Sequence, residues 1–245
     1  MCRAPASAES GRSLELCDEL AQPGHRPEIL GILAIVAACR GDAAACRNHA
    51  DAALEAAERH GQQWVRLIAL RACGLLALGQ GDLVAAVGLF EQLVAVPLAR
   101  GLRGPTVVSL PDLVEALVRL GRREEAASQA AGFERRVTDV PDLRVPALVT
   151  RCRALVDTGP DAGMAYRQAL VHHQGDPDSF VIARTQLLYG EWRAARASGG
   201  RPALSSTRRW RSSRSTARRR GRSGLVVNCG PAELCCGRGR RPGWS

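Results

Sequence analysis

Apolar residues recur along most of the chain at the three- and four-residue spacing of an amphipathic helix. Leu67 and Ile68 follow this spacing before a glycine-containing turn at 79–82, and Val84 and Val87 resume it afterwards. The apolar–polar alternation of a β-strand is not sustained anywhere. The pattern predicts ten helices, at 9–20, 27–40, 43–60, 62–79, 83–97, 107–120, 122–136, 143–157, 160–174 and 178–195.

Four similar passages read as tight turns between two helices. They centre on Gly41, Gly81, Gly121 and, less closely, Gly159, at spacings of 40, 40 and 38 residues. Glycine suits the end of a helix because it adopts the left-handed conformation at little cost. A fixed period of this size predicts a tetratricopeptide-like α-solenoid of antiparallel helical hairpins, in which each hairpin buries its apolar face by stacking on its neighbours.

A small residue follows each of the first three turns, five positions after the glycine. These residues are Cys46, Ala86 and Ala126, and we expect them to let the second helix of each hairpin approach the first closely. Pro111 is expected in a linker or a first helical turn, where its missing N–H costs little, and Asp112 near a helix start, where the helix dipole favours a carboxylate.

Composition supports an all-α fold and removes some function classes. Hydrophobic residues make up 46% of the chain but aromatic residues only 4%, because alanine and leucine dominate. All 34 basic residues are arginine. A P-loop and a Schiff-base enzyme both require a lysine, so the chain can form neither.

Charge divides the chain into three predicted segments. Residues 1–25 read as a remnant helix or arm, 26–196 as the helical repeats, and 197–245 as an Arg-rich tail. The tail holds twelve arginines and one acid, whereas residues 1–196 hold 22 arginines and 23 acids. The tail composition is typical of a disordered segment, because it offers too little apolar surface to offset the entropy lost on ordering.

The tail has two interpretations. Its richness in Arg, Gly, Ser, Pro, Cys and Trp, together with the loss of helical periodicity, is what an out-of-frame reading of GC-rich DNA produces, and we favour a frameshift. Alternatively, residues such as Arg208, Arg209 and Trp210 bind nucleic acid without sequence specificity and in a salt-dependent manner.

Three stretches carry a family resemblance. They are Leu75 to Ala126, the run Arg-Cys-Arg-Ala-Leu at 151–155, and the run Ala-Arg-Thr-Gln-Leu-Leu-Tyr-Gly-Glu-Trp at 183–192. All three resemble the tetratricopeptide-like middle region of large LuxR-type transcriptional regulators of high-GC bacteria, including actinobacteria. The likeness covers roughly residues 25–195. Such regulators also carry an amino-terminal ATP-binding module and a carboxyl-terminal DNA-binding helix-turn-helix, and we expect this chain to be a fragment that lacks both.

Candidate chemical sites are few, and we expect no catalytic, cofactor-binding or metal-binding residue. His172 and His173 are adjacent and point about 100° apart on a helix, so they cannot share a metal ion. Glu124 and Glu125 read as charges in the first turn of a helix. The carboxyl-terminal cysteines lack a C-x-x-C pair and a nearby histidine; they are Cys229, Cys235 and Cys236.

Several side chains are expected to have structural roles. Tyr189 and Trp192 share a helical face and read as hairpin packing, with a ligand or partner anchor as the alternative. Arg184 and Glu191 on the same helix are expected to be solvated or ion-paired. The cysteines inside Ala/Leu-rich helices are expected to be reduced, buried thiols; they are Cys39, Cys46, Cys73 and Cys152.

The sequence therefore predicts a non-enzymatic fragment of a LuxR-type regulator whose helical repeats recognise a protein or small effector in their groove. A free-standing repeat adaptor that binds a protein partner is the alternative, and an enzyme is disfavoured because no polar residues converge. The last predicted helix, 178–195, lacks a hairpin partner, so its apolar face is expected to promote self-association. No signal peptide or membrane-spanning stretch is expected, which favours the cytoplasm.

Overall fold

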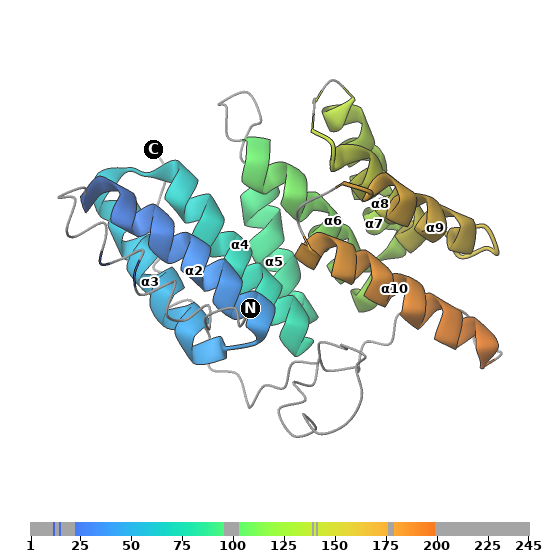
Figure 1. Ribbon diagram of the computed structural model, residues 1–245, viewed down its shortest axis with the longest axis horizontal. Helices are drawn as coiled ribbons and strands as arrows, with labels where there is room; N and C mark the ends of the chain where they lie inside the picture. Colours follow the sequence, from blue (N-terminus) through green and yellow to red (C-terminus); the bar gives the residue numbers. More distant parts are fainter. Residues whose placement is uncertain are drawn as a thin grey trace. The chain divides into compact units, whose positions relative to one another are not determined.

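Helices form all the regular structure in the part of the chain that the computed structural model describes. That part comprises residues 12, 15, 23–95, 103–138, 140, 142–175 and 179–198. Within it there is no strand, which confirms the all-α prediction (Figure 1). The elements are η1 (Pro23–His25), α2 (Arg26–Arg40), α3 (Ala43–His60), α4 (Gln63–Gln80), α5 (Leu83–Val94), α6 (Arg103–Leu120), α7 (Arg123–Val137), α8 (Val145–Val156), α9 (Ala162–His172) and α10 (Ser179–Ala197).

The observed helices match nine of the ten predicted ones to within a few residues. The predicted helix 9–20 lies largely outside the described residues, as does the predicted tail beyond Ser198. None of the described helices is both long enough and apolar enough to cross a membrane.

Three of the four predicted turns have the same geometry. Gly41, Gly81 and Gly121 adopt φ values of 70°, 79° and 87°. In each turn the glycine N–H donates to the carbonyl three residues earlier, and the next N–H donates to the carbonyl five residues earlier at 2.9–3.0 Å. This bonding satisfies the carbonyls left open at the end of a helix and reverses the chain.

The helices that follow these turns begin in two ways. Asp42 and Asp82 each accept a hydrogen bond from the backbone N–H three residues later, at 3.1 Å. Such an amino-terminal cap satisfies one of the unpaired N–H groups of the first turn. The third turn has Arg122 at this position, and its side chain instead bonds Glu125 in the first turn of α7.

The fourth predicted turn is built differently. Gly159 does not adopt a positive φ. Its N–H instead donates to Asp157 Oδ1 at 2.7 Å, in a side-chain-supported turn. Among the four predicted turns, this geometry is therefore shared by Gly41, Gly81 and Gly121 only.

Small residues lie fully buried after the three equivalent turns, as predicted. Cys46, Ala86 and Ala126 each have 0% exposed surface. At these positions a longer side chain would meet packed neighbours, since protein interiors have few voids.

The described residues divide into two compact units, with the boundary inside α4 between Cys73 and Gly74. In the first unit α2 packs on α3. Gly31 lets α2 approach α4, because a Cβ there would lie 2.8 Å from Ile68 Cγ2. Trp64 Nε1 donates to Glu28 Oε1 at 3.1 Å across the same pair of helices.

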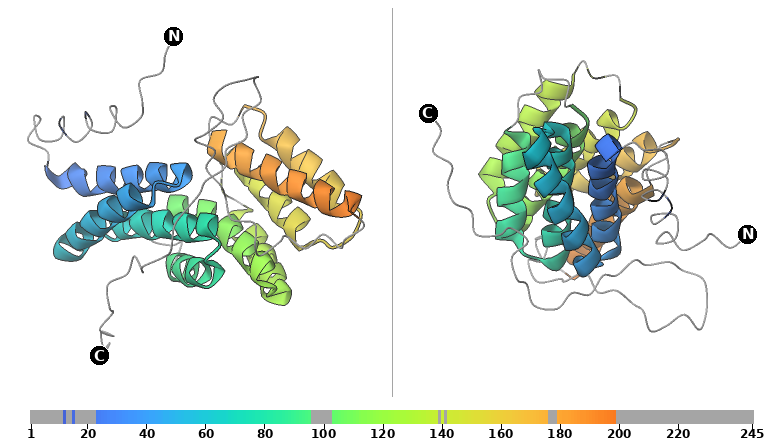
Figure 2. Two further views of the ribbon diagram at one scale, coloured as in Figure 1. Left: turned by 90° about the horizontal axis from the view of Figure 1, so that it is seen from below. Right: turned by 90° about the vertical axis from the view of Figure 1, so that its left-hand side faces the viewer.

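In the second unit α6 is the central helix and packs against α5, α7 and α8. The contacts continue from α8 to α9 and from α9 to α10 (Figure 2). Gly74 at the start of this unit lies against Phe90 of α5, and a Cβ there would come within 2.6 Å of the ring.

Three expectations from the sequence are wrong in this unit. Pro111 and Asp112 lie in the middle of α6 and not in a linker or first turn, because α6 begins at Arg103. The last described helix does not present an uncovered apolar face, because Val181 and Leu188 of α10 are buried. Packing on α9 and polar contacts with α6 cover this side of α10.

Candidate functional site

Between Ser109 and Arg119 the helix α6 is buried on all sides, and this burial forces its polar residues into the interior. Leu113, Val114 and Ala116 are 0% exposed and, at about 100° per residue, point in different directions around the helix. Asp112 and Glu115 lie among them and are 3% and 1% exposed. Because a buried charge is costly unless it is paired, these carboxylates require cationic partners.

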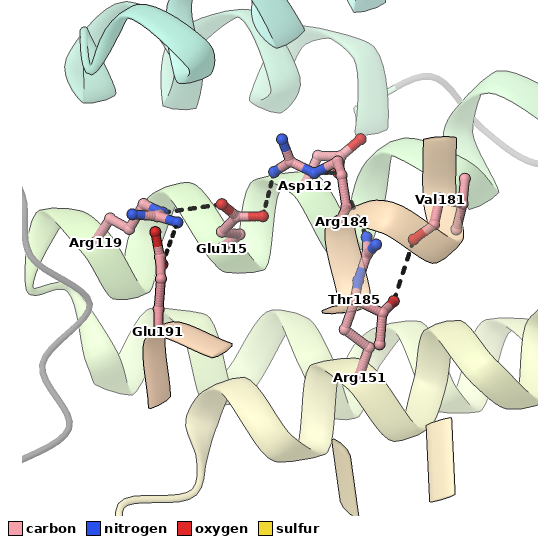
Figure 3. Close-up of polar contacts among 8 residues, drawn as sticks. All are labelled: Asp112, Glu115, Arg119, Arg151, Val181, Arg184, Thr185 and Glu191. Carbon is pink, nitrogen blue, oxygen red and sulfur yellow. Dashed lines mark hydrogen bonds and ion pairs between the residues drawn. The ribbon is translucent and has the colours of Figure 1, made fainter. Parts of the chain in front are cut away.

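Glu115 is bound by two arginines. Its Oε1 accepts a hydrogen bond from Arg119 Nε at 2.9 Å, one turn later on α6. Its Oε2 accepts a hydrogen bond from Arg184 Nη2 of α10 (Figure 3). Both carboxylate oxygens are thus used, one within α6 and one across to α10.

Further ion pairs connect the same helices. Arg119 Nη2 donates to Glu191 Oε2 of α10 at 2.8 Å. Asp112 Oδ1 pairs with Arg151 Nη2 of α8 at 3.4 Å and with Arg184 Nε at 3.7 Å. Three carboxylates therefore balance three guanidinium groups. We call this set the charge cluster; it consists of Asp112, Glu115, Arg119, Arg151, Arg184 and Glu191.

The pKa values of the two glutamates in the charge cluster are shifted in opposite directions. Burial by itself raises the pKa of Glu115, but the charges of Arg184, Arg119 and Arg151 together outweigh burial and hold the pKa below its ordinary value. Burial also raises the pKa of Glu191, and there it prevails over the attraction of Arg119, aided by repulsion from Glu115. Glu115 is thus the firmly ionised member of the pair.

The charge cluster joins helices within the second unit. Arg151 is only 1% exposed, and its Nε and Nη1 atoms make no hydrogen bond with the described protein. Within the described ranges, no three His, Cys, Asp or Glu side chains gather as a possible metal site. What the arrangement does is tie α8 and α10 to α6.

A second polar contact ties α10 to the end of α9. His173 Nε2 lies 3.1 Å from Thr185 Oγ1, and Thr185 Oγ1 donates to the carbonyl of Val181 at 3.2 Å. His173 is buried whereas His172 is exposed, so the two histidines face apart as expected. His173 has a packing role in this contact.

An aromatic stack lies in the contact between α9 and α10. Tyr166 of α9 lies 5.7 Å from the ring of Tyr189 and 6.5 Å from that of Trp192, and the last two rings are 6.1 Å apart. Gly163 makes room for this stack, since a Cβ there would lie 2.4 Å from Trp192 Cη2. Tyr189 and Trp192 therefore have the packing role predicted from their spacing.

Three exposed arginines rest on the aromatic stack. Arg167 Nη1 donates to Tyr189 Oη at 3.2 Å. The guanidinium carbons of Arg193 and Arg196 lie 5.7 Å and 5.3 Å from the ring centres of Tyr189 and Trp192. We call this surface the arginine–aromatic face; it consists of Arg167, Tyr189, Trp192, Arg193 and Arg196.

The other glutamates and cysteines considered in the sequence have structural roles or lie outside the described residues. Glu124 and Glu125 lie in the first turn of α7, and Glu125 pairs with Arg122, whose hydrogen bond lowers its pKa. Burial raises the pKa of the Cys152 thiol to about 12, as suits an inert packing cysteine. The three carboxyl-terminal cysteines lie outside the described residues.

The sequence interpretation left Arg184 and Glu191 as solvated or ion-paired; they are ion-paired, and Arg184 is buried. It missed the cluster roles of Asp112, Glu115, Arg119 and Arg151. One signal could have found the first three: apolar residues surround α6 on every face, which is typical of a helix buried all round. Arg151 carries no such signal.

Comparison of the chain with protein-family models, with curated proteins and with solved structures gives no match.

Proposed function

We propose that the chain is the helical-repeat region of a LuxR-type transcriptional regulator, and that it recognises a protein or effector as part of transcriptional control. In this proposal the helices stack as a tetratricopeptide-like solenoid, the chain has no catalytic activity of its own, and it acts in the cytoplasm. DNA binding belongs to a helix-turn-helix of the intact regulator.

The repeated turn is the observation that carries the proposal. Gly41, Gly81 and Gly121 share one left-handed conformation and one hydrogen-bond pattern at intervals of 40 residues. A repeated hairpin whose small residues are fully buried is what stacked helical repeats require. Repeats of this kind serve as recognition surfaces because stacking generates an extended concave face.

The gene itself supplies the test of regulator origin. Sequencing across codons 185–245 and beyond, with translation in all three frames, should reveal a frame that continues the helical pattern and then encodes a helix-turn-helix. The intact product should then bind promoter DNA. If no frame encodes such a domain, the regulator proposal is overturned.

One observation favours a free-standing repeat adaptor as a second candidate. A repeat protein that functions alone needs the apolar side of each helix covered. The described helix α10 meets this need, because Val181 and Leu188 are buried and Arg184 and Glu191 are ion-paired to α6. The same sequencing experiment separates the candidates, since an adaptor requires every other frame to remain closed.

A further inference from the structure

The three arginines of the arginine–aromatic face differ in their contacts from Arg122 and Arg153 of the second unit. Arg122 and Arg153 each form an ion pair with a glutamate. Arg167, Arg193 and Arg196 form no ion pair with a carboxylate among the described residues, and they contact aromatic groups instead. Their positive charge is thus available to an external anion.

The aromatic contacts also hold these arginines in place. A guanidinium over a ring face is stabilised there by the electrons of the ring, which reduces the number of conformations that the long side chain samples. A partner that binds such a restrained side chain loses less entropy than one that must order it. Guanidinium groups also bind carboxylates with two parallel hydrogen bonds.

Exposed apolar side chains border the same face. Met164 and Val171 of α9 are 59% and 57% exposed, although both are large and apolar. They are seven residues apart, so they lie on one side of the helix, with Arg167 between them at the edge nearer α10. An apolar stripe beside a row of cations is complementary to an amphipathic helix that has an acidic edge.

We propose that the arginine–aromatic face, together with Met164 and Val171, binds an amphipathic acidic helix of a protein partner. The apolar side of this helix lies on Met164 and Val171, and its carboxylates bind Arg167, Arg193 and Arg196. This inference rests on the protein-recognition role of the proposed function. It adds the surface of the chain that binds and the chemistry of the partner.

Contacts within the face favour carboxylates over single-stranded nucleic acid. Proteins that bind single strands offer aromatic rings on which bases stack. Here Arg193 lies over the ring of Tyr189, Arg196 lies over that of Trp192, and the two rings stack on each other. The surface therefore offers guanidinium groups and not ring faces.

A peptide titration with the full chain tests this proposal. The probe is a fluorescein-labelled amphipathic helical peptide with leucines along one face and glutamates beside them, and its control has glutamine in place of every glutamate. We expect anisotropy to report binding of the glutamate peptide and about tenfold weaker binding of the glutamine peptide.

Two protein variants locate the binding, and a third controls for net charge. R193Q/R196Q and M164S/V171S should each weaken binding about tenfold. R135Q/R136Q removes the same number of charges from two exposed arginines on α7 and should change affinity less than about twofold. This comparison separates the face from general attraction to the twelve arginines beyond residue 200.

Equal binding by R193Q/R196Q and R135Q/R136Q, with unchanged helical circular dichroism, would overturn the proposal. Binding of oligo(dT) that R193Q/R196Q abolishes, without binding of the glutamate peptide, would also overturn it and identify a nucleic-acid surface. Sequencing of the gene has a separate readout, so failure of this face and failure of the regulator proposal are distinguishable.

Discussion

Glu115 of α6 accepts a hydrogen bond from Arg184 of α10, 69 residues later in the chain, and both side chains are buried. This contact joins the central helix of the second unit to the last described helix. Since Glu115 also binds Arg119 on its own helix, its charge holds two guanidinium groups that have little access to water.

Replacing Glu115 by glutamine should destabilise the fold strongly. The substitution keeps the shape but leaves buried positive charge without its counterion, which costs about 3 kcal/mol or more. Urea unfolding followed by circular dichroism measures the loss. Glu125→Gln is the matched control, because Glu125 forms an exposed pair with Arg122 and should change stability little. Equal effects of the two substitutions would contradict the role given to burial.

Glu191→Gln should behave differently from Glu115→Gln as the pH changes. The raised pKa of Glu191 means that the folded state favours the protonated form of this side chain. The contribution of Glu191 to the free energy of unfolding is therefore fully present below the ordinary pKa of 4.5, and it is lost as the pH rises through the folded-state pKa. Glutamine imitates the protonated form. We therefore expect Glu191→Gln to be at least as stable as wild type at pH 7.

The lowered pKa of Glu115 has the opposite consequence. Its stabilising contribution is present above the ordinary pKa of 4.5 and is lost as pH falls through the folded pKa. The stability difference between wild type and Glu115→Gln should therefore shrink in acid below pH 4.5. Urea titrations across the acid range measure both trends, and a difference that grows in acid would contradict the assignment.

Gly163→Ala should loosen the α9–α10 contact. The added Cβ would lie 2.4 Å from Trp192, so the aromatic stack must shift, at a cost of about 1–3 kcal/mol. Gly190→Ala on α10 is the control; nothing lies within 4 Å of its Cβ position, and alanine favours a helix. Thermal unfolding should give a lower Tm for the first and an unchanged or higher Tm for the second. A stable Gly163→Ala protein would show that the stack is adaptable.

Gly81→Ala should weaken the second repeated turn. A side chain at φ 79° costs about 1–2 kcal/mol, because Cβ then crowds the backbone. Gly79→Ala, two residues earlier and still inside α4, meets no neighbouring atom within 4 Å and should be neutral or stabilising. Urea unfolding compares the two directly. Should Gly79→Ala be the more damaging, the left-handed turn would not be the critical feature.

Local features of the fold could be predicted from the sequence. Gly81 and Ala86 illustrate why. A left-handed turn requires a glycine and a close helix contact requires a small residue, and both can be recognised within a few positions of the sequence. Helix ends are harder to predict where the local sequence fits more than one position in a helix. Pro111 resembles a first-turn proline, yet α6 already extends eight residues before it.

The charge cluster could not be predicted in the same way. Arg119 and Glu191 are 72 residues apart, so no local spacing reveals their contact. Arg151 reads as one of many arginines on a helix, and only the packing of α8 against α6 makes it a buried cation. Pairing at this range depends on tertiary structure, which the periodicity of individual helices does not encode.

The order of charges in the cluster specifies the direction in which α10 docks. Along α6 an acid, Glu115, precedes a base, Arg119, whereas along α10 a base, Arg184, precedes an acid, Glu191. Turned end for end, α10 would bring arginine to arginine and glutamate to glutamate, and like-charge contacts of this kind cost several kcal/mol. Apolar packing alone tolerates several alignments of two helices. The four alternating charges thus determine the direction in which α10 runs along α6, which the packing of leucine and alanine does not determine.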